Sequence, residues 1–262
     1  MAGGLVETGE DAFAAANFDD PGSGNITNTW WTLPEGSNFL YFAESEDGCA
    51  WNLVEVLDTY DHDFDPPYDE DTETRIVLDR EWLDEDCLHE TWAAVLAAID
   101  AEDLEPEEAT YDWYAQDDTG NVWYMGEDTY DSEGSSEGSF VAGCDGALAG
   151  IVMLGNPSNG DFYQQEYYEE EAEDWGKVLN FKKLKGPEGI ICMRTKEWTP
   201  LEHGAIEQKF YCSDGETGEL SLVKELKGKT VMVELIGMDV DSPADYPESN
   251  PSPEPDCPEP EA

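Results

Sequence analysis

Short runs of aromatic and β-branched residues recur along most of the chain, and Gly, Asn, Asp and Pro residues separate them. Aromatic and β-branched side chains fit a pleated surface, whereas the separating residues favour tight turns. This alternation predicts a mainly β fold, in which a curved antiparallel sheet forms a barrel or a sandwich. The expected strands lie within 28–36, 38–43, 51–57, 74–78, 110–115, 121–125, 151–154, 162–168, 190–198, 205–211, 219–226 and 230–236.

One segment has the period of a helix instead. Its apolar residues recur at i, i+4, i+7, i+8 and i+11, and they are Leu88, Trp92, Val95, Leu96 and Ile99. Acidic residues at 84–86 precede this stripe, where the helix dipole favours negative charge. The spacing predicts one inserted α-helix over about 84–100. We also expect a short helix near 169–178.

The composition divides the chain into three parts. Residues 1–27 are rich in Gly, Asp, Asn and Ala, which is typical of a flexible N-terminal arm. Residues 28–240 contain almost all of the strand-like runs, so we expect a single β-rich domain there. Residues 241–262 are Pro, Ser, Glu and Asp with almost nothing to bury, which predicts a disordered acidic tail.

The chain is strongly acidic, with 63 Asp+Glu against 12 Lys+Arg and a formal net charge of -51 in 262 residues. Such a field repels phosphate backbones and anionic lipid surfaces, so nucleic acid is excluded as a partner. No stretch approaches the roughly 20 apolar residues of a membrane-spanning helix, so we expect no membrane insertion. Two explanations of the acidity stay open: halophilic adaptation of the surface, and specific binding of divalent cations.

The charge is unevenly distributed. Residues 1–176 contain 46 acidic and two basic residues, whereas residues 177–229 contain eight acidic and ten basic ones. The only basic run is Lys177, Lys182, Lys183 and Lys185. Its natural partner is an acidic surface, either of this chain or of a neighbouring copy. Head-to-tail contact between copies would build a filament or lattice, so self-association through these lysines is one hypothesis.

Six cysteines are scattered along the chain without any C-x-x-C pair. This even number favours disulfides in an exported domain over zinc ribbons and thioredoxin-like redox motifs, with reduced buried thiols as the alternative. The first residues lack the basic and apolar regions of a signal peptide. We therefore expect an extracellular or cell-surface protein whose export signal has been removed.

Two carboxylate clusters are candidate calcium sites, because calcium takes oxygen ligands. The first lies in 58–71, where alternate acids resemble the start of an EF-hand loop. Pro66 and Thr72 occupy the places of its required Gly and Glu, so an EF-hand is excluded. The second lies on one face of the short helix expected near 169–178. The candidate ligands are Asp61, Asp63, Asp65, Asp69, Asp71, Glu166, Glu170, Glu173 and Asp174, and solvated acidic surfaces are the alternative interpretation.

Four blocks in order resemble a known group of sequences. They are YDWYAQDDTGNVWYMGEDT at 111–129, GSFVAGCDGA at 138–147, QEYYEEEAED at 165–174, and TKEWTPLE at 195–202 followed by EQKFY at 207–211. These blocks are similar to those of a family of uncharacterised bacterial exported proteins and lipoproteins. The resemblance implies an exported β-rich domain and no particular activity. The segments 58–73 and 84–100, and Cys144, depart from the family pattern.

Catalytic signals are weak. The chain has no G-x-S-x-G elbow, no P-loop and no Rossmann fingerprint. We therefore expect an exported, acidic, non-enzymatic binding or structural protein that binds divalent cations, calcium above all. The alternatives are an extracellular hydrolase acting on glycans, with Trp and Tyr as its sugar platform, a charge-assembled lattice or filament subunit, and a sheet that encloses a small lipophilic ligand.

Overall fold

The computed structural model describes residues 3–18, 22–45, 47–62, 68, 72–183, 190–213, 222–227, 230–243 and 257. The chain is mainly β, which confirms the predicted fold class. Its elements are α1 (Glu10–Ala15), β1 (Thr27–Asn28), β2 (Trp31–Thr32), β3 (Asn38–Glu44), β4 (Cys49–His62), β5 (Thr72–Asp84), α2 (Trp92–Asp100), β6 (Glu108–Gln116), β7 (Val122–Asp131), β8 (Phe140–Val141), β9 (Leu148–Met153), β10 (Phe162–Gln164), β11 (Glu166–Tyr167), β12 (Trp175–Lys183), β13 (Ile191–Trp198), β14 (Ile206–Ser213), β15 (Leu222–Lys227) and β16 (Thr230–Met238).

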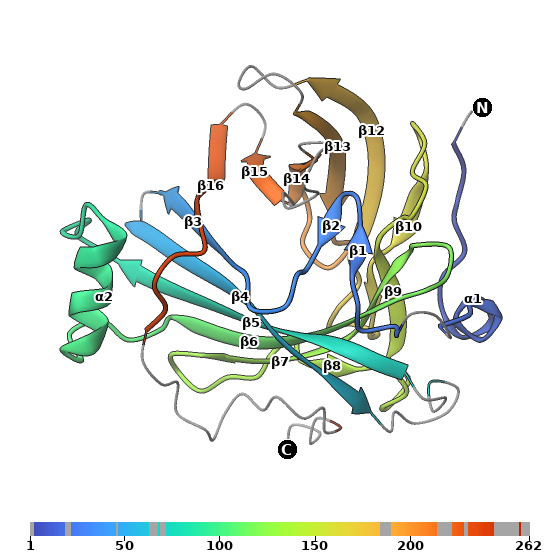
Figure 1. The fold of residues 1–262 in the computed structure, drawn as a ribbon, viewed down its shortest axis with the longest axis horizontal. Helices are drawn as coiled ribbons and strands as arrows, with labels where there is room; N and C mark the ends of the chain where they lie inside the picture. Colours follow the sequence, from blue (N-terminus) through green and yellow to red (C-terminus); the bar gives the residue numbers. More distant parts are fainter. Residues whose placement is uncertain are drawn as a thin grey trace.

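Fourteen strands form one antiparallel sheet in the order β10-β12-β13-β14-β15-β16-β3-β4-β5-β6-β7-β9-β11, with β8 beside β7. β1 and β2 form a separate hairpin. Most neighbours in this order are consecutive in the chain, so simple hairpin connections build most of the sheet. Figure 1 shows the sheet curling round, with β12 to β16 facing the long strands β3 to β7.

One short segment joins the two ends of this sheet. In β10, Phe162 pairs with Lys177 of β12. Only four residues later, Glu166 of β11 pairs with Ala149 of β9 at the opposite end of the strand order. Since both pairings belong to the continuous segment 162–167, the sheet is drawn into a nearly closed barrel. This arrangement selects the barrel from the two predicted alternatives.

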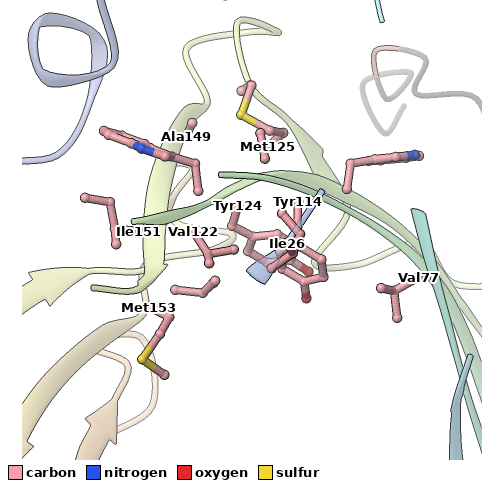
Figure 2. Close-up of a cluster of buried hydrophobic side chains, with 14 of the residues drawn as sticks. Ile26, Val77, Tyr114, Val122, Tyr124, Met125, Ala149, Ile151 and Met153 are labelled. Atoms are coloured by element: carbon pink, nitrogen blue, oxygen red, sulfur yellow. The ribbon is translucent and has the colours of Figure 1, made fainter. Parts of the chain in front are cut away.

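The main core lies where β6, β7 and β9 meet the N-terminal part of the chain (Figure 2). Tyr114 and Tyr124 are register partners whose rings stack with centroids 4.9 Å apart. The fully buried Trp123 packs edge-on against Phe13 of α1, at 5.2 Å between ring centroids. Residues near the N-terminus, predicted to form a flexible arm, therefore contribute to the core in α1.

The inserted helix exists but is shorter than predicted. β5 runs on to Asp84, and α2 begins only after Thr91, whose hydroxyl accepts a hydrogen bond from the Ala94 amide. The prediction of a helix over 84–100 was wrong at its start, because pairing with β4 extends β5 to Asp84, the first of the acidic residues. α2 packs on the sheet through Val95, which forms a second buried cluster with Leu40, Trp51, Leu53 and Trp82.

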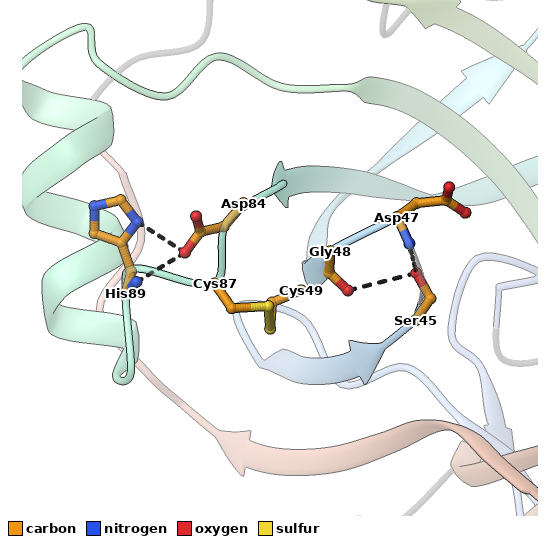
Figure 3. Close-up of a disulfide and its surroundings, with 7 residues drawn as sticks. All are labelled: Ser45, Asp47, Gly48, Cys49, Asp84, Cys87 and His89. Atoms are coloured by element: carbon orange, nitrogen blue, oxygen red, sulfur yellow. Dashed lines mark hydrogen bonds and ion pairs between the residues drawn. A yellow bond between two sulfur atoms is a disulfide. The ribbon is translucent and has the colours of Figure 1, made fainter.

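A disulfide between Cys49 and Cys87 ties the segment before α2 to the start of β4 (Figure 3). Asp84 accepts hydrogen bonds from the His89 backbone amide, at 2.8 Å, and from its Nδ1 atom, at 3.0 Å. Burial raises the pKa of Asp84, but hydrogen bonds from His89 and Leu88 outweigh it and hold the pKa below its usual value. The carboxylate therefore caps the turn that leads into α2.

The short helix expected near 169–178 was wrong. The chain makes a tight turn there, in which Tyr168 and Ala172 exchange backbone hydrogen bonds and Glu170 adopts a left-handed conformation with φ of 68°. β12 then begins at Trp175, which pairs with Trp198 of β13. Strand pairing along β12 offers more hydrogen bonds and burial than an exposed helical turn, so tertiary context overrides the local preference.

All six cysteines form disulfides: Cys49–Cys87, Cys144–Cys257 and Cys192–Cys212. This confirms the prediction of paired cysteines. Cys192 and Cys212 are register partners on β13 and β14, so their bridge links two adjacent strands. The bridge to Cys257 attaches the chain's C-terminal region to the segment between β8 and β9.

Gly150 of β9 lies close to the backbone of the segment 162–167 at the barrel seam and provides a test of closure. A Cβ atom on Gly150 would lie 2.2 Å from the Gln165 carbonyl oxygen. We expect Gly150→Ala to force β9 away from the segment 162–167 and to lower the free energy of unfolding by about 2–4 kcal/mol in urea denaturation. Gly4→Ala is the control, because a Cβ there meets nothing within 4 Å. Equal stabilities of the two variants would show that the seam does not constrain the barrel.

Candidate binding cavity inside the barrel

The interior of the barrel contains a cavity of about 310 Å³ that is partly open to solvent. Ligand sites in proteins are typically concave pockets of about 300–1,000 Å³, so this volume suits a small ligand. Strands β3, β4, β5, β6, β14, β15 and β16 form its wall, and the β2 region closes one side. The lining residues are Trp31, Leu33, Phe39, Tyr41, Phe42, Ala43, Ala50, Asn52, Val54, Val77, Asp79, Glu81, Asp112, Tyr114, Lys209, Leu222, Glu225 and Val233.

The lining combines aromatic rings with carboxyl groups. Four aromatic side chains contribute to it, from Trp31, Phe39, Tyr41 and Tyr114, whereas the Phe42 ring packs against Trp51 on the opposite face of the sheet. Its ionisable groups are one lysine and four carboxyl groups, namely Lys209, Asp79, Glu81, Asp112 and Glu225. The cavity therefore offers aromatic faces and an excess of acids, an environment that favours positive charge over negative charge.

Asp79 projects into the cavity from β5, where odd-numbered residues face inward and Leu78 and Arg80 face the other way. The Asn52 side-chain amide donates a hydrogen bond to the Oδ1 atom of Asp79. Burial, and then the nearby Asp112 carboxyl, raise the pKa of Asp79 to about 8. Much of the Asp79 population is therefore protonated at neutral pH when the cavity holds no cation.

Asp112 and Glu127 lie directly opposite each other on β6 and β7. Two carboxylates in this position repel each other. The Tyr124 hydroxyl lies within hydrogen-bond distance of both, at 2.9 Å from Glu127 Oε2. A hydroxyl has a single proton to donate, so the second bond requires a proton on one of the carboxyl groups. Burial likewise raises the pKa of Asp112 to about 7 and that of Glu127 well above its usual value.

Lys209 of β14 is the cation of this interior. Its Nζ atom lies 3.2 Å from Glu197 Oε2 and 3.9 Å from Glu225 Oε2. Burial lowers the pKa of Lys209, but these carboxylates and Glu207 outweigh that effect and raise it. Glu197 also accepts hydrogen bonds from Thr195 and Tyr211, so the Lys209–Glu197 pair is satisfied within the barrel.

The structure brings together two of the predicted calcium ligands. Glu166 and Asp174 lie close enough for Asp174 to raise the pKa of Glu166, after burial, to about 8. Glu170 is exposed in the turn before β12, and Glu173 accepts a hydrogen bond from the Glu170 backbone amide. Asp61 lies in β4, but its side chain is outside the described part. The remaining candidates, Asp63, Asp65, Asp69 and Asp71, lie outside the described residues.

Sequence reasoning missed the cavity acids Asp79, Asp112 and Glu225. Each is a single carboxyl residue within or directly after a strand-like run, whereas the prediction followed dense acidic clusters. A usable signal exists in β5, where Val77, Asp79 and Glu81 share one face. An acid on a strand face that also carries apolar residues, in a strand buried on both sides, marks a polar interior.

No family model matches the chain, and no curated protein or solved structure matches it significantly. Among the residues that the structure describes, no helix is both long and apolar enough to cross a bilayer. In the same residues, no three His, Cys, Asp or Glu side chains are arranged to share a metal ion.

The raised pKa of Asp79 predicts an inverted pH dependence of stability. The folded state binds a proton that the unfolded state has lost, so stability falls as pH rises from about 4 to about 8. We expect Asp79→Asn to flatten this fall and, at pH 8, to raise the free energy of unfolding by about 1–3 kcal/mol over the original protein. Urea denaturation at several pH values and one fixed salt concentration measures it.

Asp58→Asn is the matched control, since Asp58 is exposed on β4. Its stability profile should follow that of the original protein. Parallel profiles for the original protein and Asp79→Asn would contradict the assignment of a retained proton to Asp79.

Proposed function

We propose that this protein is an exported, non-enzymatic binding protein whose barrel takes up a small organic cation. The observation that carries the proposal is the composition of the 310 Å³ cavity, which is lined by four aromatic side chains, four carboxyl groups and one lysine. An ammonium group gains from aromatic faces and from ionised carboxylates, and an apolar body gains from the remaining wall. Lys209 is already paired with Glu197 and Glu225, which leaves Asp79, Glu81 and Asp112 for a ligand.

An organic cation fits this interior better than calcium does. Calcium takes six to eight oxygen ligands at about 2.3–2.6 Å. Metal-sharing groups of three or more acidic, His or Cys side chains are absent from the described residues. An ammonium ion needs only a few hydrogen-bond acceptors and also accepts aromatic neighbours. Calcium binding by the cluster in 58–71 stays a separate prediction, because most of those residues lie outside the described part.

The direction of the pKa shifts supports binding rather than acid–base catalysis. Burial raises the pKa of all four cavity carboxyl groups, those of Asp79, Glu81, Asp112 and Glu225. Catalysis by two carboxyl groups works best when their environments push the two pKa values apart. Acids that all resist ionisation are instead suited to exchanging protons for a bound cation.

Export is the second element of the proposal. Three disulfides use all six cysteines, and such bridges persist in oxidising compartments outside the cytosol. A protein of net charge -51 also attracts cations to its surface over a distance set by the ionic strength. The surface field and the cavity would thus act in the same direction on a positively charged ligand.

Titration with choline and with putrescine by calorimetry tests the cavity. We expect saturable binding that strengthens from pH 6 to pH 8.5, because Asp79 and Asp112 must lose protons to pair with the cation. Asp79→Asn should weaken binding about tenfold, equivalent to the loss of roughly 1.4 kcal/mol. Asp58→Asn should bind like the original protein.

A second experiment compares the thermal unfolding temperature of the protein in calcium chloride and in sodium chloride at the same ionic strength. Stabilisation by calcium beyond that by sodium, without binding of either organic cation, would replace the proposed ligand with calcium. Absence of binding by all of them, or equal binding by the Asp79→Asn variant, would contradict the proposed cavity function.

A further inference from the structure

A continuous aromatic and apolar row crosses the outer face of the barrel. Phe162 of β10 contacts Trp175 of β12, with ring centroids 6.3 Å apart. Trp175 is the register partner of Trp198 on β13, and their rings are 6.4 Å apart and nearly parallel. Trp198 pairs in turn with Ile206 of β14, which is 42% exposed. We call Phe162, Trp175, Trp198 and Ile206 the outer stripe.

The stripe faces solvent because its strands alternate. On β12 and β13, Gly176, Val178, Thr195 and Glu197 are buried inside the barrel, whereas the residues between them are partly exposed. The N-terminal segment extends the stripe at one end, since Leu5 forms a parallel bridge to Phe162 and is 57% exposed. Figure 1 shows this segment running beside β10.

Basic side chains flank the stripe. Lys177 Nζ lies 5.8 Å from the Phe162 ring centroid, and Lys196 Nζ lies 4.8 Å from that of Trp198. Arg194 and Lys182 occupy further outward positions on the same strands. Within the described parts of β10, β12, β13 and β14, no acidic residue occupies an outward position. This outward strand face thus carries lysine and arginine side chains without acidic ones, in a chain with 63 acids.

We propose that the outer stripe and its lysines form a binding site for an acidic polysaccharide. The C–H faces of pyranose rings pack on indole rings, while carboxylate or sulfate groups of the glycan pair with Lys177 and Lys196. The row is one side chain wide, which suits a linear chain. A globular partner would need about 800 Å² of surface on each side. The net charge of -51 repels a polyanion over most of the protein surface. At physiological salt the Debye length is about 8 Å, so acids farther than this from the stripe oppose glycan binding only weakly.

Two of the lysines predicted to mediate self-association, Lys177 and Lys182, lie on this face. The side chain of Lys183 and the whole of Lys185 lie outside the described part. A second copy of the chain is therefore the competing occupant, and the experiment must distinguish it from a glycan.

The test measures depletion of the full-length protein from 0.15 M sodium chloride by beads coupled to alginate, with dextran on identical beads as the neutral comparison. We expect retention on alginate and little on dextran. Trp175→Ala and Trp198→Ala should each weaken retention about tenfold. The double variant Lys177→Gln, Lys196→Gln should be retained equally by alginate and dextran. Its retention on alginate should also no longer decrease as the salt concentration rises.

Two controls lie outside the stripe: Tyr60→Ala, which removes an exposed aromatic ring, and Lys227→Gln, which removes an exposed lysine. Both should be retained like the original protein, and near-ultraviolet circular dichroism establishes that each variant is folded. The lysine variant tests the site even if a tryptophan variant does not fold.

Three results would overturn the proposal: no retention of the original protein on alginate, equal retention on dextran, or unchanged retention of the folded stripe variants. Sedimentation velocity tests the competing occupant, a second copy of the chain, by measuring the oligomeric state. Oligomers that Trp198→Ala or the lysine variant dissociates, without alginate retention, would assign the stripe to contact between copies of this chain.

Discussion

The pairing of one segment, 162–167, with both ends of the sheet is the constraint on which the molecule depends. Phe162 is held against β12 and Glu166 against β9, so strands that are remote in the strand order face each other across an interior. An open sheet would leave Asp79, Asp112 and Glu166 in water, where carboxyl groups ionise freely. Closure removes them from water and raises the pKa of each. The chemistry of the cavity is thus a consequence of topology.

Closure also reconciles an acidic interior with a stable fold. Several carboxylates confined together would repel one another strongly. The arrangement avoids this in two ways: Lys209 neutralises Glu197, and Tyr124 lies between Asp112 and Glu127 in a geometry that keeps a proton on one of them. A cation that enters can replace such a proton without creating a net uncompensated charge. Exchange of this kind is less costly than bringing a cation into a neutral apolar cavity.

Much of the fold could be predicted from the sequence, because the relevant signals are local. Periodicity and composition predict the strand-like runs and the helix between β5 and β6. The cysteine count predicts that the cysteines form disulfides, but not which cysteines bond to each other. The closure could not be predicted, since nothing in 162–167 specifies Ala149 and Lys177 as partners. For the same reason the prediction of a helix near 169–178 was wrong. Its acidic residues favour a helix locally, but pairing with the neighbouring strand makes the segment from Trp175 onward part of β12.

The candidate site escaped prediction for a related reason. Acid clusters such as 58–71 are conspicuous in the sequence, whereas Asp79 and Asp112 are single residues whose meaning depends on the side of the sheet that they face. The aromatic residues of the outer stripe and the lysines that flank it are conspicuous in the sequence, but their alignment across β10, β12, β13 and β14 requires the strand register.

Register therefore matters more here than in a barrel with an apolar interior. On β13, Glu197 is buried in the barrel interior while its neighbours Lys196 and Trp198 face outward. Because side chains alternate with a period of two, a slip of one residue would turn the basic face inward and the acid outward. The disulfide between the register partners Cys192 and Cys212 opposes such a slip between β13 and β14. That bridge thus maintains the opposite charges of the inner and outer surfaces of the same strands.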